Sequence, residues 1–267
     1  MTGAFRATVR RELRTVARSG GALALAGAVG SALVGLAWAS TSTAYATTVL
    51  SLLTPVELLV PALTAALCYR SVLGDRERGE LALVRTYPVR LRTYLAGVYV
   101  GRATAVVVAS VVPLLVAAAV PALRGPESAF LATHGGLDSP VLFARFVVLT
   151  ALFAATITAV VVALSAVART VRRGVALAAA LVVVVVVGLD LAVVAGLATG
   201  LLPEEALAAA LVVGPNGAYR SLVLQTVVAP VVTSPVRAGA TLPALASLFV
   251  WSGGALVVAT RAAARYD

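Results

Sequence analysis

The sequence contains no lysine, because all 21 of its basic residues are arginines. A Walker A phosphate-binding loop requires a lysine that reaches the β- and γ-phosphates of ATP. The chain therefore cannot be an ATPase of that class. It also lacks the amine that would form a Schiff base with a carbonyl substrate.

Metal-binding side chains are almost as scarce, since the chain has one histidine, one cysteine and one methionine. These residues cannot assemble a zinc or copper site within one chain, and a lone cysteine precludes an intrachain disulfide. We interpret His134 as a solvated loop residue and Cys68 as a small packing residue. Neither a G-x-S-x-G elbow nor an H-E-x-x-H motif occurs, and Glu204 and Glu205 have no nearby histidine. The sequence thus predicts no cofactor, no metal and no catalytic residue.

Charged residues make up only 12% of the chain, against 61% hydrophobic residues, and the mean hydropathy is +1.01. Such values are typical of an integral membrane protein. Crossing about 30 Å of hydrocarbon takes roughly 20 helical residues. Six apolar runs are long enough, near residues 20–40, 49–70, 95–121, 141–168, 174–202 and 239–260. We predict an all-α, polytopic fold in which residues 1–267 form a single domain of six transmembrane helices.

The arginines are distributed unevenly between the loops. The N-terminal arm, the segment after the second span, the loop "RTVRR" and the C-terminal tail together hold 16 of the 21. Because short basic loops are retained in the cytoplasm, both termini are predicted to lie there, with the chain in the cell membrane. The opposite loops hold only Arg124, Arg220 and Arg237, and Arg102 and Arg145 fall inside predicted spans. The net charge of +10 then marks the inner leaflet, so no nucleic-acid partner is expected.

The N-terminal arm carries apolar residues at steps of four, four and three, namely Phe5, Val9, Leu13 and Val16. This spacing, with arginines on the other faces, is typical of an amphipathic helix. We therefore expect an interfacial elbow helix over residues 1–19 that leads into the first span. The alternative is a secretory signal, because Ala37-Trp38-Ala39 resembles an A-x-A cleavage site.

Three charged residues, Glu57, Arg145 and Asp190, fall in the outer halves of predicted spans. Counted at 1.5 Å per residue from the outer ends, they lie about 12, 6 and 18 Å deep. Charges at such depth are costly in lipid and usually face protein or water. Two interpretations remain open. In the first, the residues have a structural role, either as a packing ion pair or as a protonated carboxyl buried between helices. In the second, they line a transport pathway.

Residues 203–238 form an unusual outer segment, because "ALAAALVV" and "SLVLQTVVAPVVT" are apolar yet too short to cross the membrane. Between them lies "GPNGAYR", residues 214–220. We expect two short helices broken at Gly214, Pro215, Asn216 and Gly217. A re-entrant hairpin covered by protein is one interpretation, and an amphipathic helix pair on the outer surface is the other.

The stretch "GDRERGELALVRTYPVR", residues 74–90, is the most highly charged part of the chain between two spans. Asp75 is placed to cap a helix, Glu77 and Glu80 put negative charge in its first turn, and Pro88 ends it. Its apolar edge consists of Leu81, Val84 and Tyr87. We predict a cytoplasmic helix of about three turns, which is either a solvated loop helix or an element that docks into a partner's groove.

This stretch has an acidic-arginine-acidic start, a glycine, an apolar run, then proline, arginine and a glycine that opens the third span. In this sequence these are Asp75-Arg76-Glu77, Gly79, Leu81 to Val84, Pro88, Arg90 and Gly97. The pattern resembles the ABC transporter permeases of the type-2, exporter-like class. That family also shares the elbow helix, the six spans, the cytoplasmic termini and a broken outer segment between spans five and six.

Within that family, "GPNGAYR" is similar to the asparagine-proline, aromatic-arginine stretch of the NosY-type permeases. These permeases serve the copper-processing complex that matures nitrous oxide reductase. The residues that carry the resemblance are Asn216, Tyr219 and Arg220. Gly214 stands where that pattern has asparagine, and Gly217 stands where it often has an acid.

The resemblance implies a non-catalytic permease subunit in the lipid bilayer that pairs with a second copy of itself and carries two cytoplasmic ATPase subunits. An accessory protein on the outer face is also implied. ATP-driven closure would push on the coupling helix and cause substrate export or mechanical work on that outer partner. The residues expected to contact the ATPase are Arg76, Glu77, Gly79, Leu81 and Val84. The alternatives are an ion- or proton-coupled secondary transporter that uses Glu57 and Asp190, and a structural membrane anchor.

Overall fold

The computed structural model describes residues 2–40, 44–80, 90–124, 139–231 and 240–265. Within these ranges all regular structure is helical, and six helices are long and apolar enough to cross a membrane. They are Gly20–Ala39, Tyr45–Glu77, Leu91–Leu123, Pro140–Val167, Val171–Ala198 and Thr241–Ala264. Each overlaps one of the apolar runs in the sequence, so the predicted all-α fold with six spans is confirmed.

Several spans combine more than one helical element. The elements are α1 (Thr2–Ala17), α2 (Gly20–Ala39), α3 (Tyr45–Cys68), α4 (Leu73–Glu77), α6 (Leu91–Ala117), α7 (Ala119–Arg124), α8 (Pro140–Val167), α9 (Val171–Val183), α10 (Leu189–Ala198), α11 (Leu207–Ala210), α12 (Pro215–Val223) and α13 (Thr241–Ala264). A π-helical turn, η1 (Val184–Gly188), joins α9 to α10, and a second, η3 (Leu224–Val228), follows α12.

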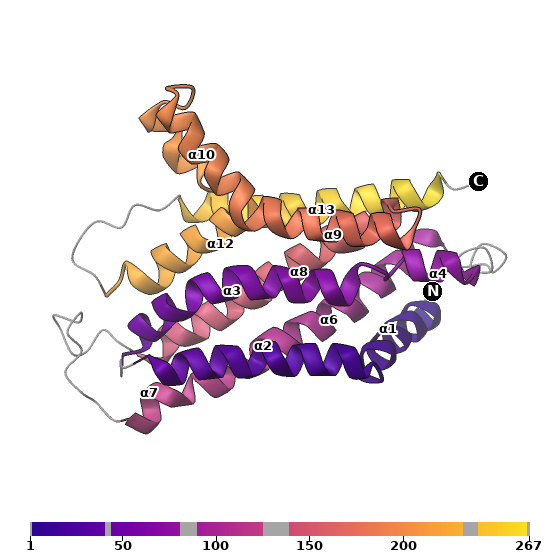
Figure 1. Cartoon of the computed structure of the whole chain (residues 1–267), viewed down its shortest axis with the longest axis horizontal. Coiled ribbons are helices and arrows are strands. Elements are labelled where there is room, and N and C mark those ends of the chain that lie inside the picture. The colour runs from indigo at the N-terminus through magenta and orange to yellow at the C-terminus, as the bar shows by residue number, and fades with distance from the viewer. Residues whose placement is uncertain (1, 41–43, 81–89, 125–138, 232–239, 266–267) are drawn as a thin grey trace.

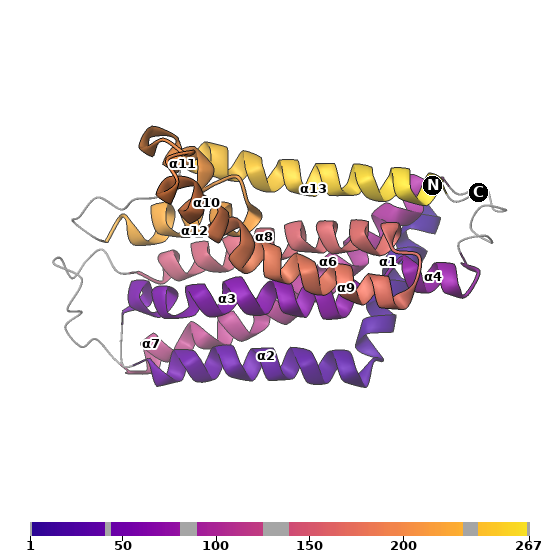
Figure 2. The ribbon, with the colours of Figure 1, turned by 45° about the horizontal axis from the view of Figure 1, so that its top comes forward.

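Helix α8 lies at the centre of the bundle and packs against α3, α6, α12 and α13. Helix α2 lies on the outside, where it contacts α3 and α6. Figure 1 shows α1, α4 and both chain ends at one end of the bundle and α12 toward the other, while α10 projects away from the bundle. In the rotated view, α1 runs across the end of the long helices (Figure 2). This arrangement places the arginine-rich segments together at a single end.

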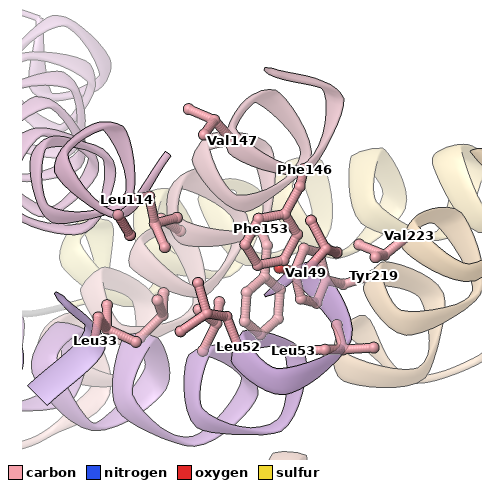
Figure 3. Packing of buried hydrophobic residues seen from close by; sticks show 14 of the residues in the cluster. Leu33, Val49, Leu52, Leu53, Leu114, Phe146, Val147, Phe153, Tyr219 and Val223 are labelled. Atoms are coloured by element: carbon pink, nitrogen blue, oxygen red, sulfur yellow. The ribbon is translucent and has the colours of Figure 1, made fainter. Parts of the chain in front are cut away.

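The largest apolar cluster joins α2, α3, α6, α8 and α12. At its centre the ring of Tyr219, from α12, stacks on Phe153 of α8 at 4.6 Å between ring centroids, with Phe146 close by. Figure 3 shows these rings beside Val49 of α3. Residues of the outer segment thus belong to the core of the bundle.

Two glycines let α1 approach α6 closely. A Cβ atom at Gly97 would lie 2.7 Å from Cβ of Thr8, and one at Gly101 would lie 2.6 Å from Cβ of Glu12. Real Cβ atoms do not tolerate such distances, so any larger residue would push the helices apart. The glycine that opens the third span in the sequence pattern therefore has a physical role as a seat for α1.

Candidate functional site

Helix α4 is fixed to the inner end of α8 by hydrogen bonds in both directions. The hydroxyl oxygen of Ser165 accepts hydrogen bonds from the backbone N–H groups of Val72 and Leu73, each at 3.1 Å. In return, the guanidinium of Arg76 donates to the carbonyl oxygens of Ala166, at 2.8 Å, and Ala168. Each contact satisfies groups that a helix end leaves unpaired. The two helices therefore cap one another.

Because of this mutual capping, α4 differs from the helix that the sequence predicts. Asp75 is not the N-cap, because α4 begins two residues earlier, at Leu73, where the cap comes from Ser165. The predicted three turns are also interrupted, since α4 ends at Glu77 and Gly79 has a φ of +73°. That left-handed conformation favours glycine, so Gly79 makes a turn here. Two of the expected contact residues, Leu81 and Val84, lie outside the described residues.

Asp75 is the centre of a charged network that joins α4 to α1 and α6. Its side chain, in a residue only 2% exposed, accepts hydrogen bonds from Arg11 of α1, from the hydroxyl of Tyr94 on α6 and from Arg78 at 2.5 Å. Arg11 also binds Glu80 at 2.8 Å. A movement of α4 would therefore displace groups on both α1 and α6.

A second buried acid, Glu12, continues this network along α1. Its carboxylate pairs with Arg11 at 2.7 Å and with Arg102 of α6 at 2.7 Å, and Arg102 also donates to the carbonyl oxygen of Leu67 at 2.8 Å. Sequence reasoning did not single out Glu12 and placed Arg102 only inside a span. The available signal was that Glu12 is the only acid in the arginine-rich arm and lies beside its apolar stripe.

The network shifts the pKa values of Arg11, Arg78 and Glu80. Burial by itself would lower the pKa of the Arg11 guanidinium, but the charges and hydrogen bonds of Asp75 and Glu12 outweigh it and raise that pKa. The hydrogen bond from Arg78 lowers the pKa of the Glu80 carboxyl. The same bond raises the pKa of Arg78. Arg11, Arg78 and Glu80 are therefore charged at neutral pH.

The residues expected to contact a partner divide into two groups. Glu77 and Gly79 are exposed, and Glu77 pairs with Arg70 of the same chain at 2.8 Å. Arg76 instead points inward, onto the end of α8. The structure therefore gives Arg76 an anchoring role and leaves Glu77 and Gly79 on the accessible surface.

A separate ion-pair network lies toward the other end of the bundle. The guanidinium of Arg220, on α12, binds both carboxylate oxygens of Glu57 at 2.6 and 2.8 Å and reaches Asp190 of α10 at 2.8 Å. Glu57 is 2% exposed, whereas the side chains of Asp190 and Arg220 are 35% and 37% exposed. The two intramembrane acids singled out from the sequence thus meet at one arginine that the sequence placed in an outer loop.

Arg145, the third charged residue in a predicted span, does not join this network. Its side chain is exposed and donates to the backbone carbonyl oxygen of Thr226, at 2.9 Å, in η3. This contact ties α8 to the π-helical turn that follows α12. The structure therefore brings together Glu57 and Asp190 and leaves Arg145 apart from them.

The part of the outer segment that forms α12 is deeply packed, whereas α11 has no buried residue. Tyr219 is fully buried and shares a hydrogen bond of 2.8 Å with the hydroxyl of Thr150 on α8. Asn216 is 1% exposed, and neither atom of its amide finds a hydrogen-bond partner in the described part of the chain. The expected break also moves, since Pro215, Asn216 and Gly217 form the first turn of α12. Proline is favoured at that position because its missing N–H is not needed there.

Metal binding finds no support in the described ranges, where no group of three His, Cys, Asp or Glu side chains is placed to hold an ion. Cys68 is fully buried in the main apolar cluster, as expected for a packing residue. His134 lies outside the described residues.

Comparison with known proteins supports the pattern around α4. A search of curated proteins gave no match. A family model described as "ABC-2 family transporter protein" matches residues 12–266, almost the whole chain, including α4, the outer segment and all six spans. The chain therefore belongs to the ABC-2 family of transporter proteins, and it is the membrane permease subunit of an ABC transporter.

Proposed function

We propose that α4 and the turn after it are the coupling element through which a separate ATPase subunit drives this permease. The observation that carries the proposal is the double anchoring of α4. Its buried side binds α1, α6 and α8 through Asp75, Arg76 and the Ser165 cap, while Glu77 and Gly79 face outward. A push on the exposed side is transmitted to three other helices, because polar contacts in a buried network resist separation.

The side of the membrane follows from the same end of the bundle. The α4 end holds α1, the C-terminal end of α13 and most of the arginines. Short arginine-rich segments are retained in the cytoplasm, so this end faces the ATPase and both termini are cytoplasmic. Glu77 would then exchange its exposed partner Arg70 for a basic residue of the ATPase.

A second copy of the chain completes the transporter, and we place it against α9 and α10. These helices and the turn η1 between them expose large apolar side chains, including Val183, Val187, Leu191 and Val194. Asp190 and the guanidinium of Arg220 are partly exposed within the spanning region. Charges there are costly in contact with lipid, and a second copy would cover them. Each permease copy would bind one ATPase subunit.

The output of the cycle would reach the outer side through α12. Two outputs fit this geometry, namely export of a substrate and mechanical work on an outer accessory protein. The similarity of Asn216, Tyr219 and Arg220 to NosY-type permeases supports a role in copper-site maturation of nitrous oxide reductase. In that case copper would be handled by partner proteins, because this chain has one histidine, one cysteine and one methionine.

A secondary transporter would use Glu57 and Asp190 as carriers of a proton or an ion. Both carboxylates are instead compensated by one guanidinium, and Glu57 is held by two hydrogen bonds. Protonating Glu57 would leave Arg220 without its main partner in a partly buried site. The geometry therefore favours an ATP-driven permease in which this network is a structural lock.

Cysteine crosslinking to the ATPase that co-purifies with the chain tests the coupling element. Single cysteines at Glu77 and Leu81, in a Cys68→Ser background, should crosslink to the ATPase. The matched control is Arg172→Cys, an exposed residue at the N-terminal end of α9. Efficient crosslinking from position 172, with positions 77 and 81 unreactive, would show that residues 74–90 are only a solvated loop.

A further inference from the structure

An apolar groove opens between α2 and α6, directly beside the C-terminal half of α1. It has a volume of about 710 Å³, and its lining includes Leu13 and Val16 of α1, Ala26 and Gly27 of α2, and Ala105 and Ala109 of α6. Small residues on both long helices keep the groove open. The groove follows α2 from Ala22 to Val34, which at 1.5 Å per residue is about 18 Å.

That length matches one lipid chain. The hydrocarbon core of a bilayer is about 30 Å thick, so one leaflet contributes about half of it. A groove that begins at the interfacial helix α1 and continues for about 18 Å covers the depth of a single leaflet. Its apolar lining fits an acyl chain.

Three arginines adjoin the end of the groove that α1 lines. Arg10 and Arg14 of α1 and Arg18, directly after it, follow one another at intervals of four residues. They line a hollow of about 450 Å³ together with Ala7, Arg11 and Thr15. No acidic residue lines this hollow, and within the described part of the chain none of the three arginines forms an ion pair. Leu13 and Ala17, which border them in sequence, line the apolar groove. A strong positive charge therefore stands beside the groove without a counter-charge.

The neighbouring arginines differ, because their charges are already balanced. A polar cavity of about 740 Å³ shares Val16, Ala22 and Leu67 with the groove, and its arginines bind the acids described above. Arg11 and Arg102 are thus committed to α4 and α1. Of the arginines that line these cavities within the described residues, Arg10, Arg14 and Arg18 therefore remain to attract an anion.

We propose that this site binds one anionic phospholipid of the inner leaflet, with an acyl chain in the groove between α2 and α6 and its phosphate on Arg10, Arg14 and Arg18. Basic pockets beside membrane helices on the cytoplasmic side recognise such headgroups. A second copy of this chain is a poorer occupant, because Glu77 and Glu80, the exposed acids near α4, are already paired.

A bound lipid would act on the coupling element through α1. Arg11 lies between Arg10 and Glu12 and holds both Asp75 and Glu80. Fixing α1 against α2 and α6 would keep this network assembled. That consequence rests on the proposed function, whereas the binding site itself does not.

Binding is tested by native mass spectrometry and by titration of the purified chain with phosphatidylglycerol or phosphatidylcholine. Phosphatidylglycerol should bind more tightly. The triple variant R10Q/R14Q/R18Q should weaken it on the order of tenfold to a hundredfold, since each arginine near an anionic surface contributes about 1 kcal/mol. The control R172Q/R173Q/R265Q removes three exposed arginines elsewhere and should leave binding unchanged. Equal binding of the two lipids, or equal loss in both triple variants, would overturn the proposal.

Removing three arginines also weakens the signal that retains the N-terminus in the cytoplasm, so a second arm leaves the charge intact. A Cβ at Gly27 meets no atom within 4 Å, so Gly27→Leu should fill the groove and displace the lipid. Gly35→Leu, on the same helix but outside the groove, is equally unobstructed and is the control. Lipid binding that survives Gly27→Leu contradicts the site. So does a disulfide between two copies carrying Gly27→Cys in the Cys68→Ser background, because the groove would then face a second chain.

Discussion

Arg220 donates two hydrogen bonds, of 2.8 and 2.6 Å, to the carboxylate of Glu57, which lies 163 residues earlier in the sequence. The contact joins α12 to the middle of α3, and the same guanidinium reaches Asp190 on α10. Helices α12 and α10 each adjoin a π-helical turn. The turn η3 follows α12, and the turn η1 precedes α10. Such turns often mark functional sites in helical proteins. The network is therefore placed to hold three elements that could otherwise shift independently.

The two acids of this network should differ in their effect on stability. Glu57→Gln should lower stability by roughly 3 kcal/mol, because removing one partner of a buried pair leaves the other charge poorly compensated. Asp190→Asn should cost only about 1 kcal/mol, because that carboxylate is partly exposed. Thermal unfolding of the purified chain compares the variants. If either variant keeps its stability but abolishes ATP-coupled activity, that acid belongs to a transport pathway. If both leave stability and activity unchanged, neither interpretation holds.

The sequence predicted the six spans well because a run of apolar residues reports directly on membrane depth. It could not predict that Arg220 pairs with Glu57, since no local pattern links residues of different helices. The lone charges inside otherwise apolar spans were the available hint that partners were required. The predicted start of helix α4, with Asp75 as its cap, was wrong for a similar reason. The cap that decides it, Ser165, is 92 residues away from Leu73, and tertiary contacts override local capping preferences.

Close packing of α1 on α6 predicts an asymmetric response to glycine substitution. Gly101→Ala should destabilise the chain by roughly 1–3 kcal/mol, because the new Cβ would lie 2.6 Å from Cβ of Glu12. Gly253→Ala on α13 is the matched control, since a Cβ there meets no atom within 4 Å. Alanine is the better helix former, so this control should be neutral or slightly stabilising. Thermal melting distinguishes them, and equal melting temperatures would show that the α1–α6 crossing is loose.

The low pKa of the Glu80 carboxyl predicts a weak dependence of stability on acid. The hydrogen bond from Arg78 favours the charged form, with Arg11 adding to it and Asp75 also nearby. The stabilisation is therefore fully present above the unfolded pKa, about 4.3, and is lost as the pH falls through the lower folded value. Melting temperatures at pH 7 and below pH 4 should differ more in the wild type than in Glu80→Gln. The difference should be small, because this side chain is partly exposed and solvent screens it.

The cap that Ser165 places on α4 predicts where the coupling element is most easily weakened. Ser165→Ala leaves the buried N–H groups of Val72 and Leu73 without their acceptor, which should cost about 1–3 kcal/mol and loosen α4 locally. Hydrogen exchange in residues 70–80 should accelerate, and ATP hydrolysis by the bound ATPase should become uncoupled from transport. Ser110→Ala is the control, because among the described residues that buried hydroxyl bonds only to the carbonyl of Val106 in its own helix. Its loss leaves no N–H group unpaired, so exchange near α4 should stay at the wild-type rate. Unchanged exchange in Ser165→Ala would mean that α4 is held by Arg76 and Asp75 alone.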